Sequence, residues 1–322
     1  MQQSNNFDGL RLVGALLVLI SHQFALSGRP EPESLHTTAG TLGVLIFFSI
    51  SGYLIAGSWR ADPSLWRFSA RRFLRIWPAL AAVVLITAAA GWRSPEAARY
   101  LRNLYLLGRV DGPFFPGNPH KELNGALWTI PMEVICYAAL ALTALVSGKR
   151  LHLVLVTSAV TVIPLFMLAF GTDLLSGSVP AGPAFLPYFG SYFLAGAALQ
   201  FVRASTQSLV MLSLLGVGSQ LVGATALGLV LIIPAVCVAL GRMSSPLLRD
   251  AGRFGDLSYG IYLWAWPVQQ VGVAILGRER SVPLLASCTL AAVLLLSWLS
   301  WHLVEKQALM LKPRPRSMSN NH

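Results

Sequence analysis

Apolar stretches, most of them long enough to cross a lipid bilayer, recur along this chain of 322 residues. A membrane-spanning helix needs about 20 mostly apolar residues. Only 11% of the residues are charged, which is about half the share found in soluble domains. The sequence therefore predicts an all-α, polytopic integral membrane protein. We expect about ten transmembrane helices, at residues 10–26, 39–57, 77–92, 126–146, 151–170, 184–202, 207–220, 222–241, 257–276 and 283–303.

Basic residues indicate the orientation of these helices. An even number of spans places both chain ends on the same side of the membrane. With the N-terminus in the cytoplasm, 16 Lys and Arg residues face the cytoplasm and 8 face the other side, a bias that agrees with the positive-inside rule. We therefore expect both termini to be cytoplasmic. Residues 207–241 hold too few positions for two full spans, so one of these two helices should be short, tilted or re-entrant.

We expect one transmembrane domain, residues 1–305, followed by a short basic cytoplasmic tail, residues 306–322. The ending KPRPRSMSNNH is typical of a disordered segment. The leader MQQSNNFDG has no basic region and no cleavage pattern after the first apolar run, so this span should stay attached. The outward connection 93–125 carries GPFFPGNPHKELNG, whose Pro and Gly content predicts an irregular, lid-like loop.

The net charge of +11 does not indicate a nucleic-acid partner, because the basic residues cluster at span ends rather than on one soluble face. Anionic membrane lipids, and in part an anionic ligand, account for this charge. Cys136, Cys237 and Cys288 lie in apolar runs without metal-ligand spacing. His36 and His120 stand in outward loops without a clustered second ligand, and we predict no metal site.

Two ionisable residues lie in the first apolar run, FDGLRLVGALLVLISHQF. Arg11 and His22 are eleven residues apart, close to three turns of helix, so both side chains share one helix face. His22 then lies about 16 Å deeper in the membrane than Arg11. An ionisable group at that depth is costly and usually faces a cavity, a partner or a substrate path. His22 is therefore the leading candidate for chemistry.

A cluster of arginines precedes the third span, in RFSARRFLRIWP. Arg71, Arg72 and Arg75 fall within five positions on neighbouring turns of one helix. They could fix the topology by binding lipid phosphates. Alternatively, because Arg suits bidentate phosphate contacts, they could hold a multiply phosphorylated ligand. The sequence leaves both interpretations open.

Glu133 lies several residues inside an apolar span, where an unpaired carboxylate is expensive. It should meet a cation, a hydroxyl-rich substrate or water, and a structural ion pair with one of the arginines is the alternative. Pro131 can open the helix here and free backbone groups to line a cavity. In GDLSYGIYLWAWPVQQ, the aromatic residues indicate an interfacial belt, but Tyr259 and Tyr262 share one face and could bind a sugar or an adenine ring.

Five motifs follow one another along the chain. The first is Arg11, ten residues and His22, and the second is FFSISGYLI from Phe47. The third is RRFLRIWP, the fourth joins Leu127 and Trp128 to Glu133, and the fifth joins Ser258, Tyr259, Tyr262, Leu263 and Pro267. With these motifs the chain resembles, over nearly its whole length, the acyltransferase type 3 family. Members of that family are membrane-embedded enzymes that O-acylate surface polysaccharides and related glycans.

The chain departs from the family pattern in two places. Ala265 stands where members often carry a histidine before the Trp-Pro pair, so any role of that group is absent. Near the last span, Glu305, Lys306 and Gln307 lack only the usual closing proline. The chain ends about twenty residues after its last span, so it resembles members without a C-terminal hydrolase-like domain.

The resemblance implies a bacterial inner-membrane enzyme that moves an acyl group, with acetyl expected, from cytoplasmic acyl-coenzyme A to a hydroxyl of a surface or lipid-linked glycan. Acyl-coenzyme A is then a co-substrate, and no bound cofactor is expected. The thioester arm would run inward past Arg11 towards His22. The histidine would act as general base or would itself carry the acyl group; we prefer the first route.

The remaining candidates have supporting roles under this hypothesis. Arg71, Arg72 and Arg75 would bind the phosphates of acyl-coenzyme A on the cytoplasmic side. With His22 and Arg11, Glu133 completes the expected catalytic group. The expected acceptor-binding residues are Asn124, Trp128, Tyr259 and Tyr262.

Two other functions fit the same architecture. A transporter or flippase of an anionic or glycan substrate could use His22, Glu133 and the arginines as a proton-coupled or anion-coupled path. Transporters often have related halves, and residues 1–150 and 170–310 show no such symmetry. A lipid-binding scaffold would not need an ionisable residue deep in a span.

Overall fold

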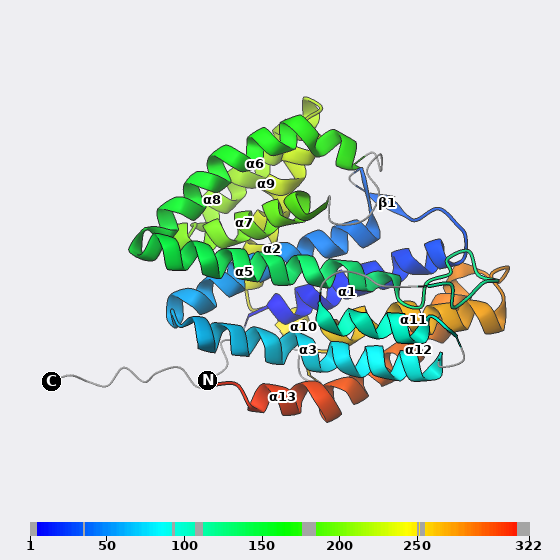
Figure 1. Ribbon diagram of the computed structural model, residues 1–322. Coiled ribbons are helices and arrows are strands. Elements are labelled where there is room, and N and C mark those ends of the chain that lie inside the picture. Colours follow the sequence, from blue (N-terminus) through cyan, green and yellow to red (C-terminus); the bar gives the residue numbers. More distant parts are fainter. Residues whose placement is uncertain are drawn as a thin grey trace.

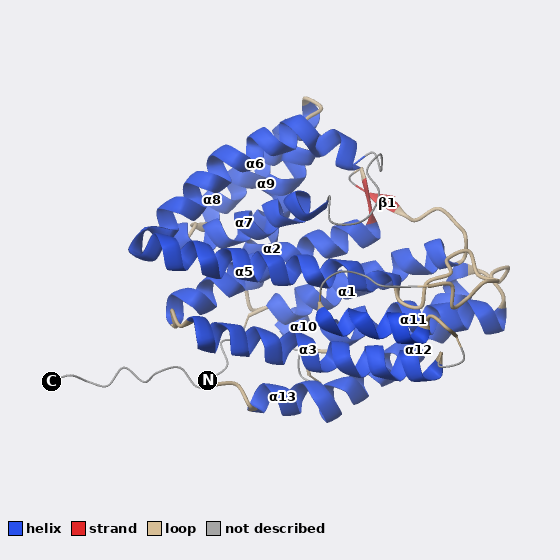
Figure 2. Cartoon of the chain, viewed as in Figure 1, coloured by secondary structure: helices blue, strands red, loops and turns tan. Residues whose placement is uncertain are grey.

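The computed structural model describes residues 5–34, 36–91, 94–106, 112–175, 185–249, 251 and 255–313. These residues are almost entirely helical (Figure 2), which confirms the all-α prediction. Within the described ranges the strands are two residues long: β1 (Glu33–Ser34) pairs antiparallel with β2 (Thr37–Thr38).

A long helix overlaps each of the ten predicted spans, although the helix at the third span begins at Leu65, twelve residues earlier than predicted, and so includes the clustered arginines. They are α1 (Phe7–Leu26), α2 (Ala39–Ala61), α3 (Leu65–Ala90), α5 (Thr129–Ser147), α6 (Leu151–Leu175), α7 (Leu186–Val202), α8 (Thr206–Leu221), α9 (Thr225–Arg242), α11 (Ser258–Leu276) and α12 (Val282–Ser300). Shorter helical segments connect them: α4 (Ala97–Tyr100), η1 (Leu101–Tyr105), η2 (Gly125–Trp128), η3 (Gly148–Arg150), α10 (Pro246–Arg249), the π-helical turn η6 (Trp301–Glu305) and α13 (Lys306–Met310).

Six of the described helical stretches are both long and apolar enough to cross a membrane, and one of them, Gly125–Gly171, contains α5 and most of α6. The protein is therefore a multi-pass membrane protein, while ten crossings remain a prediction. The helix α8 has only 16 residues, or about 24 Å. It is shorter than the roughly 30 Å hydrocarbon core, as expected for one of the two helices in residues 207–241.

The helix α2 lies between two groups of helices (Figure 1). It packs against α1 on one side and α7 on the other. Glycines allow both contacts: a Cβ at Gly43 would lie 2.4 Å from the Gly14 carbonyl oxygen of α1, and one at Gly52 would lie 1.9 Å from the Phe193 carbonyl oxygen of α7. Small residues let helix backbones approach this closely in membranes, and this packing fixes α2 in the centre of the bundle.

The outward connection 93–125 is only partly irregular. Residues 112–124 are non-helical, as predicted, whereas 97–105 form α4 and η1, which lie against α3. The buried Tyr100 hydroxyl lies 3.3 Å from the Thr87 hydroxyl, and the Trp77 indole donates a hydrogen bond of 3.1 Å to the Leu104 carbonyl. Since Thr87 and Trp77 are about 15 Å apart along α3, the connection turns back into the bundle. Residues 92–93 and 107–111 lie outside the described parts.

The C-terminal end continues α12 without a break. The helix passes through the π-helical turn η6 into α13, and both segments pack against α3. Such π-helical turns occur frequently at functional sites. The start of the expected tail, Lys306–Met310, is therefore helical, and the disorder expected for its end concerns residues 314–322, which lie outside the described residues.

Candidate functional site

A cavity of about 440 Å³ opens between α1, α2, α3, α5, the start of α11 and the C-terminal end, on the side predicted to face the cytoplasm. We call it the charged cavity, because seven ionisable side chains other than tyrosine line it: Asp8, Arg11, Arg72, Arg75, Glu133, Asp256 and Lys312. Four of them are cationic and three are acidic. Two of the three clustered arginines thus face the same space as Arg11 and Glu133, although they are far apart in sequence.

Asp256 organises the cations of the charged cavity. Its carboxylate accepts a hydrogen bond from Arg75 and lies 3.8 Å from the Arg11 guanidinium. The Ser258 hydroxyl donates a further bond of 2.5 Å to it. Burial alone would raise the pKa of Asp256, but the two guanidiniums and the serine hold this pKa below its usual value. Asp256 therefore stays ionised and keeps Arg11 and Arg75 side by side.

Arg71 and Arg72 point to different places. Arg71 donates a 2.7 Å bond to Asp62, which Arg67 also holds through both carboxylate oxygens, and Arg71 does not line the charged cavity. The bonds from Arg67 and Arg71 hold the pKa of Asp62 well below its usual range. Arg72 lines the cavity, and its buried Nε has no hydrogen-bond partner among the described residues. Of Arg71 and Arg72, only Arg72 therefore offers an unused hydrogen-bond donor to a ligand in the cavity.

Glu133 is bound by hydroxyl groups. It accepts a hydrogen bond from the Tyr137 hydroxyl and another of 2.9 Å from Ser51. Within the described ranges no cation lies at ion-pair distance from it. The alternative prediction, a structural ion pair between Glu133 and an arginine, is therefore wrong for this structure. Because Glu133 lines the charged cavity, its carboxylate is accessible to a polar ligand.

His22 lies away from the charged cavity, further along α1. Its ring is partly exposed, but its Nδ1 atom is buried and has no hydrogen-bond partner among the described residues. The ring meets the edge of Trp266, with ring centroids 4.7 Å apart, and the same indole meets His120 at 5.6 Å. No sequence pattern links His120 to His22, because the contact of both rings with Trp266 of α11 arises from tertiary packing. In the part of the chain that the structure describes, no group of His, Cys, Asp and Glu could hold a metal ion.

A smaller cavity of about 40 Å³ extends the charged cavity into the bundle, and Phe47, Glu133 and Tyr259 line both. At its inner end the Tyr262 hydroxyl lies 2.5 Å from the Thr129 hydroxyl and donates to the Ala126 carbonyl at 2.9 Å. Tyr259 and Tyr262 therefore line an inward route whose other lining residues are mostly apolar, and their contact with a substrate stays a prediction.

Two predicted acceptor-binding residues lie outside both cavities. Asn124 is fully buried; it donates to the Leu263 carbonyl at 3.0 Å and accepts from the Ala126 amide at 3.2 Å, which caps η2. Trp128 packs against Phe185 and Phe189. In this structure both side chains contribute to packing, and their contact with an acceptor stays a prediction.

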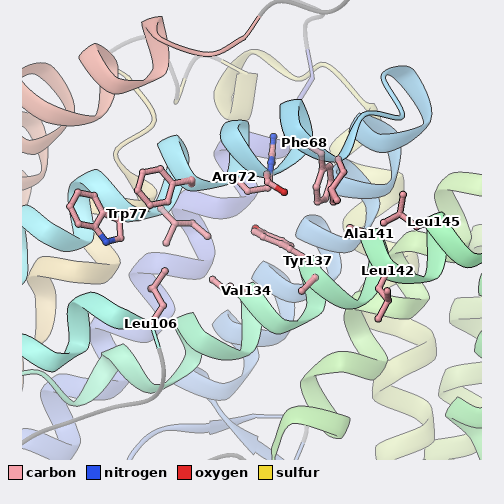
Figure 3. A pocket seen from close by; sticks show the side chains of 14 residues that line it. Phe68, Arg72, Trp77, Leu106, Val134, Tyr137, Ala141, Leu142 and Leu145 are labelled. Atoms are coloured by element: carbon pink, nitrogen blue, oxygen red, sulfur yellow. The ribbon is translucent and has the colours of Figure 1, made fainter.

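An apolar groove of about 360 Å³ lies beside the charged cavity, between α3 and α5 (Figure 3). Apart from Arg72, Ser69 and the tyrosine hydroxyl of Tyr137, its lining is apolar, and side chains of the two helices face each other across it. Arg72, Ile76 and Tyr137 line both spaces. The groove and the charged cavity therefore share a wall formed by these three side chains.

Comparison with known proteins identifies one family and several relatives. Residues 4–302 match the family described as an acyltransferase domain. The chain is 34% identical to an O-acetyl transferase of Shigella phage Sf6, over 96% of this chain and 97% of that protein. It is 31% identical to Nodulation protein 10 of Rhizobium leguminosarum bv. viciae over 42% of this chain and 43% of that protein.

A third relative, from Komagataeibacter xylinus, is provisionally named a membrane-bound transacylase, BcsY. It is 26% identical over 98% of this chain and 86% of its own length. No solved structure matches the chain significantly.

Proposed function

The chain belongs to this acyltransferase family, and we propose that it transfers an acyl group, with acetyl expected, from cytoplasmic acyl-coenzyme A to a hydroxyl of a surface or lipid-linked glycan. The general activity, transfer of an acyl group to a hydroxyl group, follows from the family and from the O-acetyl transferase relative. Membership of an enzyme family also sets aside the transporter hypothesis. The donor, the glycan acceptor, the bacterial inner membrane and the role of each residue are parts of the proposal.

One observation carries the proposal: a cavity lined by four cations, on the predicted cytoplasmic side, includes Arg11, which shares a face of α1 with His22. Coenzyme A has several phosphate charges at one end and its thioester at the other. Arg72 and Arg75 face the space that would hold the phosphates. Arg11 and His22 are about 16 Å apart along α1, so an extended donor arm is needed to link the two regions.

The chemistry at His22 would proceed as general base catalysis. A ring nitrogen of His22 accepts the proton of the acceptor hydroxyl while the hydroxyl oxygen attacks the thioester carbonyl carbon. The tetrahedral intermediate then collapses, the carbon–sulfur bond breaks, and the imidazolium returns the proton to the departing thiolate. In the alternative route, a ring nitrogen attacks the thioester first and passes the acyl group on.

The other predicted residues fit around this step. Glu133 would orient a hydroxyl-rich ligand in the inner end of the charged cavity, as it already accepts hydrogen bonds from two hydroxyls. Tyr259 and Tyr262 would contact substrate along the inward route.

The test uses membrane vesicles that contain the wild-type protein, His22→Ala or His152→Ala, with acetyl-labelled acetyl-coenzyme A and lipid-linked glycan extract. His152 is exposed on α6 and serves as the matched control. Transfer of label by the wild type and His152→Ala, but not by His22→Ala, supports the proposal. Equal transfer by all three removes His22 from the chemistry, and no transfer with any acyl donor refutes acyl-coenzyme A as the donor.

A further inference from the structure

The C-terminal end of the chain forms one wall of the charged cavity. Glu305, at the end of the π-helical turn, is buried; it accepts a 3.0 Å hydrogen bond from Ser300 and lies 3.7 Å from Arg75. The ion pair with Arg75 links η6 to α3, and both η6 and α13 pack against that helix. As a result, Leu309 and Lys312 line the cavity, although the sequence placed both in a cytoplasmic tail.

Lys312 lies nearer the cytoplasmic end than the arginines do. The helix α3 and the segment from η6 to α13 run in opposite directions along each other (Figure 1). Starting from the contact between Arg75 and Glu305, the helix runs on to Met310, about 7.5 Å further towards the start of α3, and Lys312 follows two residues after its end. Arg72 precedes Arg75 by only about 4.5 Å on the same axis. Lys312 therefore lies further towards the start of α3 than Arg72 and Arg75 do.

The charges around Lys312 are unbalanced. Arg75 has Asp256 and Glu305 as partners, and Arg71 has Asp62. Among the described residues, by contrast, no carboxylate lies at ion-pair distance from Lys312. Its partial burial, and the positive charges of Arg72, Arg75, Arg71 and Arg11, lower the pKa of Lys312 to about 8. Among the described residues Arg72 likewise has no carboxylate at ion-pair distance, and two such cations in one cavity are suited to an anion with several charges.

The following inference rests on the proposed function and assigns a role in donor binding to one more residue, Lys312. We propose that Lys312 binds the 3′-phosphate on the ribose of the acyl-coenzyme A donor, while Arg72 and Arg75 face its diphosphate. The thioester must point inward towards His22, so the adenosine end lies at the mouth. The 3′-phosphate belongs to that end, and Lys312 is the cation that the structure places there.

The test compares two ligands that differ in this one phosphate. Coenzyme A and dephospho-coenzyme A, which lacks the 3′-phosphate, are titrated against the purified full-length protein in nanodiscs. The variants are Lys312→Ala, Lys312→Arg and, as a matched control, Lys306→Ala, which removes an exposed lysine of α13 that does not line the cavity. Thermal unfolding of each variant checks that the fold is kept.

A hydrogen bond between charged groups contributes about 1.5–3 kcal/mol, which corresponds to a roughly ten- to hundredfold change in affinity. Lys312→Ala should therefore weaken coenzyme A binding by about that factor and leave dephospho-coenzyme A binding within about twofold. Lys312→Arg and Lys306→Ala should bind both ligands nearly as the wild type does.

Two results would overturn the assignment: an equal loss of both ligands in Lys312→Ala, or no loss of either. Acetyl transfer by the wild type in the vesicle assay separates this outcome from failure of the proposed function. If the wild type transfers label and binds coenzyme A, only the role of Lys312 is refuted. If it neither binds coenzyme A nor transfers label, the proposed donor is refuted together with it.

Discussion

Replacing Asp256 by Asn should lower the stability of the protein and at the same time tighten donor binding. The carboxylate contacts the guanidiniums of Arg75 and Arg11 and accepts a bond from Ser258. Removing one partner of a fully buried ion pair costs about 3–5 kcal/mol. The Asp256 side chain is 15% exposed and borders a cavity that water can enter, and Arg75 keeps Glu305. We therefore expect a smaller loss, about 2–3 kcal/mol.

The same change adds one positive charge to the cavity. At an effective dielectric constant of about 20, a unit charge about 8 Å from a bound phosphate contributes roughly 2 kcal/mol, equal to about thirtyfold in affinity. Water in the cavity reduces this value, so Asp256→Asn should bind coenzyme A several-fold to about thirtyfold more tightly. Raising the salt concentration should shrink the difference.

The measurements are thermal unfolding and coenzyme A titration of the purified protein in nanodiscs. Glu279→Gln is the control, because it makes the same charge change at an exposed carboxylate near the predicted outward end; it should alter neither quantity. Weaker coenzyme A binding by a folded Asp256→Asn would refute the reasoning. It would show that Asp256 positions Arg75 and Arg11 for the donor rather than competing with it for them.

Three further predictions concern the arginines of α3, Lys312 and Gly52. Arg72→Ala should raise the KM for acyl-coenzyme A about tenfold or more, and Arg71→Ala much less, because only Arg72 lines the charged cavity; equal effects in steady-state assays would contradict this. Since the pKa of Lys312 is about 8, its charge is present below that pH and lost above it. The wild-type KM for the donor should therefore rise between about pH 7 and 9. In Lys312→Arg the charge persists, so the KM should stay flat over this range. Gly52→Val should reduce the yield of folded protein in size-exclusion chromatography, because a Cβ at Gly52 would lie 1.9 Å from the Phe193 carbonyl oxygen.

Local patterns in the sequence were enough to predict the helices. Apolar run length depends only on neighbouring residues, so each of the ten predicted segments overlaps a helix, and one of the two helices expected to share residues 207–241, α8, is short. The start of α3 was missed, because its first turns are rich in arginine. The connection 93–125 shows the limit of such reasoning. Its irregular part was predicted from Pro and Gly, but its return into the bundle depends on contacts of Tyr100 and Leu104 with α3, which no local pattern encodes.

For the candidate site, the sequence identified residue types and the structure decided which of them meet. Adjacent arginines have opposite surroundings, because Asp62 holds Arg71 outside the cavity while Arg72 faces into it. No sequence pattern predicted that His120 and His22 lie near each other, with both rings in contact with the ring of Trp266. A side chain's direction depends on how its helix is rotated against its neighbours, and that rotation is a property of the whole bundle.

By itself, the sequence determined that this protein is an all-α membrane protein with an ionisable pair, Arg11 and His22, on one face of its first helix, because hydrophobic run length and helical periodicity are local properties. Only the tertiary structure decided that Asp256 and Lys312 join Arg11 and Arg75 around one cavity. These residues come from distant parts of the chain, and long-range packing of α1, α3, α11 and the C-terminal end is what brings their charges together.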